Sequence, residues 1–120
     1  MTKYDLEERL IDFSVQIIEI INELLNTKAA NHLGGQLLRS GTSCPLNYGE
    51  AQSAESNKDF VHKMSIILKE LRESFICMKI IERANLFPNI KKLESIKIEN
   101  NELIAIFVTS ISTTKKNSSK

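Results

Sequence analysis

Residues 4–26 read YDLEERLIDFSVQIIEIINELLN. Apolar side chains recur in this stretch at alternating steps of four and three residues, which is the period of one face of an α-helix. They are Leu6, Leu10, Phe13, Ile17, Ile20 and Leu24. A second apolar stripe, spaced by seven residues, comprises Ile11, Ile18 and Leu25. The stretch therefore predicts a helix about 35 Å long whose wide apolar face contacts more than one neighbour.

A second helix is predicted over residues 31–52, although this segment holds all four glycines of the chain and Pro45. Each internal Gly costs a helix about 1 kcal/mol and Pro about 3 kcal/mol. The segment is therefore either a loop or a helix whose small residues let neighbours approach and whose proline bends it. Four residues share one face at helical spacing: Leu37, Gly41, Cys44 and Tyr48. This spacing favours the bent helix.

Two further helices are predicted over residues 56–84 and 90–112. The third helix has its own apolar row of Phe60, Met64, Ile67, Leu71, Met78 and Ile81. Ser56 and Asp59 fit a capping box at its start, Asn85 suits a left-handed residue at its end, and an irregularity is expected near residues 99–101. Four helices with short connections predict an all-α, up-down-up-down four-helix bundle over residues 1–112. The polar residues 113–120 are expected to form a disordered tail.

The composition is that of one ordinary globular domain. The 120 residues include 16 Lys and Arg against 15 Asp and Glu, for a net charge of +1. This balance lacks the basicity of a typical autonomous nucleic-acid-binding domain. The N-terminus is acidic, unlike a signal peptide, and no apolar run reaches the length of a membrane span. We therefore expect a cytoplasmic protein without a membrane partner.

No catalytic, cofactor-binding or metal-binding constellation is recognisable. His32 and His62 stand alone and fit no metal-ligand spacing, and no phosphate-binding loop or nucleophile–base set occurs. Cys44 and Cys77 form no CxxC motif and are expected to be reduced, partly buried thiols. We expect neither an enzyme nor a small-molecule substrate.

The charge is unevenly distributed along the chain. Residues 1–26 hold two basic and six acidic residues, residues 56–84 hold six and four, and residues 85–120 hold six and three. This asymmetry either pairs subunits, presents a basic surface to phosphates, or reflects solvated helix faces alone. The candidate phosphate-binding residues are Lys63, Lys91, Lys92 and Lys97.

Arg39 lies in an otherwise apolar part of the second helix. If it is buried, an arginine there needs a carboxylate partner. Glu70 and Glu73 are the candidates, because antiparallel neighbours bring the end of one helix to the start of the next. We expect Arg39 to pair with one of them and to set the helix register; the alternative is an exposed Arg39 without a structural role.

The stretch from Gln36 to Ala51, QLLRSGTSCPLNYGEA, resembles the signature of a bacterial four-helix bundle family. This family is also known as the intervening-sequence protein of large-subunit ribosomal RNA genes. Its pattern is Q-L-x-R-S/A-x-T/V-S-I-x-x-N-I/Y-x-E-A/G, from which Cys44 departs by replacing the usual Ile. The segments 58–60, 65–74 and 102–106 look like its other blocks. The resemblance singles out as structural motif residues Arg39, Ser43, Asn47, Glu50, Glu70 and Glu73.

The resemblance implies an up-down bundle that assembles as a homopentameric ring. A related branch, the accessory protein of diversity-generating retroelements, binds a reverse transcriptase and nucleic acid, but that branch is strongly basic. We therefore expect a non-enzymatic assembly module with RNA or a nucleoprotein as partner, binding through weak basic surfaces repeated around the ring. The alternative is a protein-binding scaffold without nucleic-acid contact. A continuous basic face favours the first function and a large apolar patch the second.

Overall fold

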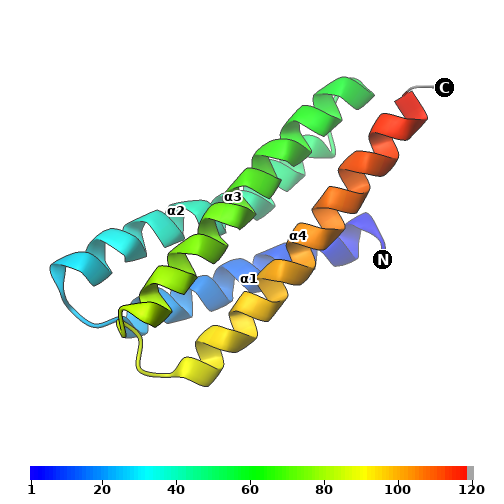
Figure 1. Ribbon diagram of the computed structural model, residues 1–120. Helices are drawn as coiled ribbons and strands as arrows, with labels where there is room; N and C mark the ends of the chain where they lie inside the picture. Colours follow the sequence, from blue (N-terminus) through cyan, green and yellow to red (C-terminus); the bar gives the residue numbers. More distant parts are fainter. Residues whose placement is uncertain (119–120) are drawn as a thin grey trace.

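The computed structural model describes residues 1–118, and these form four helices and no strand (Figure 1). The helices are α1 (Lys3–Glu23), α2 (Lys28–Ala51), α3 (Asn57–Arg83) and α4 (Ile90–Ser118). Each helix packs against its neighbours in the chain, and α1 also packs against α4. The result is an elongated up-down-up-down bundle of 51 × 22 × 21 Å, which confirms the predicted all-α fold.

Side-chain caps explain where the helices begin. Thr2 accepts a hydrogen bond from the Asp5 backbone N–H, and the Asp5 carboxylate accepts one from the Thr2 N–H, which completes a capping box. Thr27 caps α2, which therefore begins three residues before its predicted start. Ser56 caps α3 as expected, but the Asp59 carboxylate accepts from the Glu55 N–H instead of from Ser56.

The end of α3 follows the predicted signal. Asn85 has a φ of 56°, in the left-handed region, and the Leu86 N–H donates to the Ile81 carbonyl at 3.0 Å. This is the Schellman arrangement that stops a helix. The Asn89 side chain then accepts from the Lys92 N–H and caps the start of α4.

The apolar rows predicted from spacing form the core. Leu10, Ile17 and Ile20 of α1 are fully buried, as are Met64, Ile67 and Leu71 of α3. Tyr48 of α2 meets Phe107 of α4 edge-on, with ring centroids 6.0 Å apart. The core is therefore continuous across all four helices.

The glycine- and proline-containing segment is helical, so the loop interpretation is wrong. Pro45 lies inside α2 and has no N–H to donate to the Gly41 carbonyl, one turn earlier. That buried carbonyl instead accepts a hydrogen bond from the Ser14 hydroxyl of α1 at 2.7 Å. A Cβ atom at Gly41 would lie 3.0 Å from Ile17, so the glycine is what allows α1 to approach this closely.

Two expectations about α4 are wrong. The helix does not end at Ser112 but continues to Ser118, so residues 113–118 of the expected tail are helical; residues 119 and 120 lie outside the described part of the chain. The hydroxyls of Thr114 and Ser118 donate to carbonyls one turn earlier. The two lysines of the last turn interact favourably with the negative end of the helix dipole.

The expected irregularity at residues 99–101 is also absent from the described α4. Asn100 is fully buried, and its amide nitrogen donates to the Leu71 carbonyl of α3 at 3.0 Å. Its Oδ1 has no partner among residues 1–118. The asparagine thus links α3 to α4 and leaves α4 continuous.

The Ser14–Gly41 hydrogen bond predicts a measurable coupling between Ser14 and Pro45. Ser14→Ala should lower the free energy of unfolding by about 1–3 kcal/mol, because the buried Gly41 carbonyl loses its donor. Pro45→Ala supplies an N–H for the same carbonyl, so Ser14→Ala should cost clearly less in that background. Urea denaturation of the wild type, both single variants and the double variant measures this coupling. An equal cost in both backgrounds would contradict the explanation.

Candidate functional site

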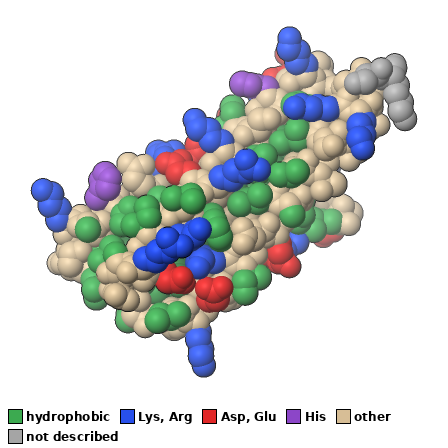
Figure 2. Space-filling view, in the orientation of Figure 1, with side chains coloured by type: hydrophobic (Ala, Val, Ile, Leu, Met, Phe, Trp, Pro, Cys, Tyr) green, Lys and Arg blue, Asp and Glu red, His purple; other side chains and the backbone are tan. Residues whose placement is uncertain are grey.

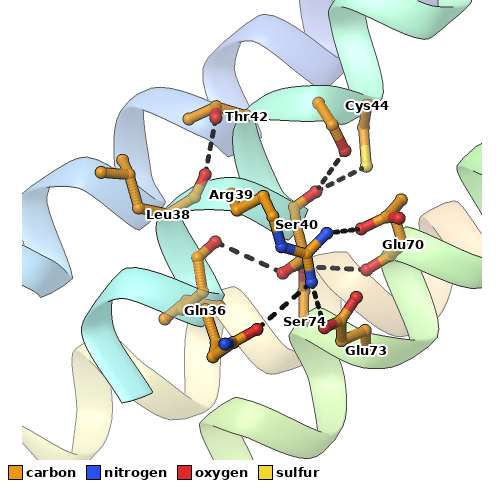
Figure 3. A network of polar contacts seen from close by, with 11 residues as sticks. Gln36, Leu38, Arg39, Ser40, Thr42, Cys44, Glu70, Glu73 and Ser74 are labelled. Atoms are coloured by element: carbon orange, nitrogen blue, oxygen red, sulfur yellow. Dashed lines mark hydrogen bonds and ion pairs between the residues drawn. The ribbon is translucent and has the colours of Figure 1, made fainter. Parts of the chain in front are cut away.

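Arg39 joins α2 to α3 through a cluster of polar contacts (Figure 3). Its guanidinium donates to Glu70 at 3.0 Å, to Glu73, and to the Gln36 side-chain oxygen at 3.3 Å. The predicted pairing is confirmed, with both carboxylates instead of one. The Arg39 side chain is 52% exposed, so it pairs with these carboxylates without being buried. The hydrogen bond from Arg39 lowers the pKa of Glu73.

A row of small polar side chains lies beside this cluster. The hydroxyls of Ser40 and Ser74 are 2.7 Å apart in the buried contact between α2 and α3. Ser43 and the Cys44 thiol both donate to the Ser40 carbonyl. Burial raises the pKa of Cys44 to about 12, so its thiol is protonated and inert at neutral pH. These residues hold two helices together and supply no nucleophile.

The remaining motif residues make no comparable contacts. Asn47 is half-buried and Glu50 is exposed on α2. Neither side chain forms a hydrogen bond or ion pair with another residue of the described range 1–118. Cys44 and Cys77 are free thiols and both are buried, as expected.

Three of the four lysines selected from the sequence are already paired. The contacts are Lys63 with Asp59 at 3.4 Å, Lys92 with Glu23 at 2.8 Å, and Lys97 with Glu82 at 3.0 Å. Lys91 is exposed and has no ion pair within residues 1–118. Lys63 lies near the start of α3, whereas the other three lie near the start of the antiparallel α4. The four lysines therefore do not form one surface.

Lys97 is the most strongly engaged of the three paired lysines. Its side chain is only 13% exposed. Burial alone would lower the pKa of Lys97, but hydrogen bonds to Glu82 and Glu94 outweigh that effect and raise it. Its charge is neutralised within the protein, so it contributes little to the attraction of an external anion.

Five other cations lie on one face of α3, together with a histidine and two uncharged residues. Steps of four and three residues connect the positions of this face, which we name the α3 basic row: Lys58, His62, Ser65, Lys69, Arg72, Ile76, Lys79 and Arg83. All are exposed except Lys79, which is half-buried with its ammonium 5.6 Å from the centre of the Phe75 ring. At 1.5 Å per residue the row is about 38 Å long. Figure 2 shows Lys and Arg side chains spread over the face that α3 and α4 present.

The carboxylates of α3 lie off this row, although Glu73 is near enough to Lys69 for their charges to attract. Each of the four is engaged by a cation outside it: Asp59 by Lys63, Glu70 and Glu73 by Arg39, and Glu82 by Lys97. No carboxylate of residues 1–118 lies at ion-pair distance from Lys58, Lys69, Arg72 or Arg83. The row is therefore a band in which positive charge exceeds negative charge.

A groove between α3 and α4 extends the basic row. Its floor is apolar, with Leu68, Val108 and Ile111, and it holds about 480 Å³. Arg72, Lys115 and Lys116 line its edge. The described lining residues include no carboxylate, so the groove shares the positive sign of the row.

The sequence analysis missed the basic row because it considered only the total numbers of basic and acidic residues in α3 and not their positions around the helix. The signal was present in the spacing: the cations recur at steps that keep them on one face, while the four carboxylates fall on others. Within residues 1–118 no group of His, Cys, Asp or Glu side chains could hold a metal ion, and no helix is long and apolar enough to cross a membrane.

The Arg39 cluster predicts a pH-dependent stability. Arg39→Met should lower the melting temperature at neutral pH by removing both ion pairs. Arg39 lowers the pKa of Glu73 in the folded state. The resulting stabilisation is therefore fully present above the pKa that Glu73 has in the unfolded chain, and it is lost as the pH falls through the lower pKa that Glu73 has in the folded protein. Thermal denaturation from neutral pH down to about pH 3 should therefore show the wild type and the variant converging in acid. A constant difference would exclude the ion pair as the cause.

Comparison with known proteins agrees with this fold. A solved structure from Bacteroides thetaiotaomicron, described as a protein of unknown function from the S23 ribosomal protein family, superposes with a TM-score of 0.84. It is 28% identical, and the match covers 93% of this chain and 99% of the other. No curated protein sequence is significantly similar. The family model of the 23S rRNA-intervening sequence protein matches residues 2–109, nearly the whole chain, and the chain therefore belongs to that family.

Proposed function

We propose that this chain is a cytoplasmic, non-enzymatic assembly protein that binds the phosphate backbone of RNA through the α3 basic row. The observation that carries the proposal is the segregation of charge on α3. Five cations lie in the row, and all four carboxylates of the helix are engaged elsewhere. In a chain with a net charge of only +1, this arrangement concentrates positive potential on one face.

The side chains of the row suit backbone contact more than base recognition. Lys and Arg bind phosphate oxygens, whereas binding to unpaired bases relies on exposed aromatic rings that stack on them. Within residues 1–118, Tyr4 on α1 is the one strongly exposed aromatic side chain, and Phe75 lies beneath Lys79. Binding should therefore depend on charge and salt, with little preference for sequence.

Several basic rows in one assembly would compensate for the weak RNA binding of a single row. The family resemblance leads us to propose a homopentameric ring, in which five rows contact one RNA or nucleoprotein at once. Linked weak sites gain avidity through a high effective concentration. This multivalency is consistent with the modest net charge of one chain.

Salt-dependent binding of a labelled RNA hairpin tests the proposal. Fluorescence anisotropy should show saturable binding to the wild type that weakens steeply with salt. Lys69→Gln and Arg72→Gln should each weaken binding and reduce the slope of log K against log salt by about 0.9 for each lost duplex phosphate contact per chain. Both residues are exposed, so the fold should be unchanged.

Lys28→Gln is the matched control for this experiment. It removes one exposed cation at the start of α2, outside the row. It should leave the salt slope unchanged, and so should Lys92→Gln, which removes a lysine that Glu23 already neutralises. Absence of wild-type binding at low salt, or equal effects of Lys28→Gln and Arg72→Gln, would count against the basic row.

A protein-binding scaffold is the second candidate function, and a specific surface favours it. The outer face of α1 and α2 exposes a set of large apolar side chains, including Ile11, Val15 and Leu46. Exposed apolar patches of this kind mark protein contacts. If RNA does not bind, this surface is the one to pursue.

A further inference from the structure

Two neighbouring hollows form one continuous groove between α3 and α4. One holds about 480 Å³ and reaches Arg72, and the other holds about 770 Å³ and reaches Lys58 at the start of α3. Lys115 of α4 lines both hollows, so they adjoin. Between Lys58 and Arg72 the helix advances about 21 Å, or about four turns. We name the whole the α3–α4 groove, and its apolar floor consists of Val61, Leu68, Val108 and Ile111.

The α3 side of the floor belongs to a longer apolar stripe that is covered at its other end. Val61, Leu68 and Phe75 recur along α3 at seven-residue spacing. The ammonium groups of Lys79 and Lys97 lie over the Phe75 ring, 5.6 and 6.0 Å from its centre. Val61 and Leu68 are half-buried and line the groove instead. The stripe is therefore covered at Phe75 and open within the groove.

The charged side chains that border this floor are all positive within the described part of the chain. Four cations line the groove: Lys58, Arg72, Lys115 and Lys116. Neither residues 60–69 of α3 nor residues 103–118 of α4 include an acidic residue. The nearest acidic residue in α3, Asp59, is engaged by Lys63 at 3.4 Å. In Figure 2, hydrophobic side chains lie between Lys and Arg side chains on the face that α3 and α4 present.

The groove depends on the continuation of α4 to Ser118. If α4 ended at Ser112, as its sequence predicts, the cations of its last turn would belong to a flexible tail. Figure 1 shows the end of α4 beside the start of α3, beyond the N-terminus of α1. Both walls of the groove are thus helical along its whole length. A preformed groove avoids the entropic cost of ordering a tail when a ligand binds.

We propose that the α3–α4 groove binds an acidic amphipathic helix of a partner protein. Such a helix would place an apolar stripe on the floor and carboxylates beside the cations of both walls. A helix of about 14 residues spans the length of the groove. Insertion of an amphipathic helix into an apolar groove is a recurrent mode of peptide recognition. The inference goes beyond the proposed function, because it adds a different ligand beside the α3 basic row.

The combination of apolar floor and positive walls selects this partner over other ligands. An RNA backbone would pair with the cations but would make no apolar contact with the floor. An uncharged helix would cover the floor but would gain nothing from the cations. An acyl chain would remain partly in water, because the groove is open along its length and small-molecule sites enclose most of their ligand. An acidic amphipathic helix matches both surfaces and keeps its polar face in solvent.

Binding of a designed peptide tests the inference. The probe is a fluorescein-labelled helix of about 15 residues with Leu at every third or fourth position and Glu on both sides of that stripe. Fluorescence anisotropy should show saturable binding to the wild type. Replacing every Glu of the probe by Gln, or every Leu by Ala, should each weaken binding by about tenfold. Absence of saturable binding of the original probe would overturn the inference.

Val108→Gln tests the floor of the groove on the protein itself. Val108 is 42% exposed, so the bundle should remain folded, and the lost apolar contact should weaken peptide binding by about tenfold. Ile98→Gln is the matched control, because it introduces the same residue at an exposed position of α4 that does not line the groove. It should bind the peptide like the wild type. Circular dichroism checks the helical content of both variants, and equal peptide affinities for the two would contradict the inference.

The RNA hairpin separates this inference from the proposed function. Val108→Gln removes no charge and should leave the RNA affinity unchanged. Lys69→Gln removes a cation of the α3 basic row that does not line the groove, so it should weaken RNA binding and leave peptide binding nearly unchanged. Weaker RNA binding by Val108→Gln would assign the groove to RNA and overturn the inference. Failure of RNA binding alone would leave the peptide result intact, so the two proposals fail separately.

Discussion

The missing N–H of Pro45 is the constraint on which the arrangement of α1 and α2 depends. It leaves the buried Gly41 carbonyl without its helical donor, and the Ser14 hydroxyl satisfies that carbonyl from α1. Gly41 removes the Cβ that would otherwise keep Ile17 away. Pro45 thus leaves an acceptor unsatisfied, Gly41 makes room for α1, and Ser14 supplies the donor. The helix-breaking residues of the segment therefore serve as the contact site of a neighbouring helix.

Comparable polar contacts join the other helix pairs. Ser40 meets Ser74 between α2 and α3, and Asn100 donates to a carbonyl of α3 from α4. Between α1 and α4 the polar contacts are ion pairs nearer the surface, where Arg9 binds Glu99. The hydrogen bond to Glu99 raises the pKa of Arg9. Apolar rows alone would tolerate sliding of one helix along another. Directed hydrogen bonds at single positions select one register, because a shift would leave a buried polar atom unpaired.

Helical periodicity predicted the parts of the structure that depend on one helix at a time. The apolar rows, the Asn85 stop and the position of Arg39 opposite two carboxylates all follow from spacing and antiparallel order. The ion pairs of three lysine candidates could not be predicted, because charge neutralisation is a property of neighbouring helices: Lys92 pairs with Glu23, which lies 69 residues earlier. The buried role of Asn100 was missed for the same reason. A polar residue in a helix is expected to be exposed, and its sequence does not show that a backbone carbonyl of another helix will accept its hydrogen bond.

The distribution of charge connects these structural contacts to the proposed activity. Lys63, Lys97 and Arg39 each neutralise carboxylates of α3, and in doing so they remove negative charge from the vicinity of the basic row. Residues that stabilise the bundle thus also determine its electrostatic surface. A near-neutral chain divided in this way carries its excess of positive charge along α3. Assembly of several copies through surfaces other than this one would therefore increase the number of phosphate contacts without covering any.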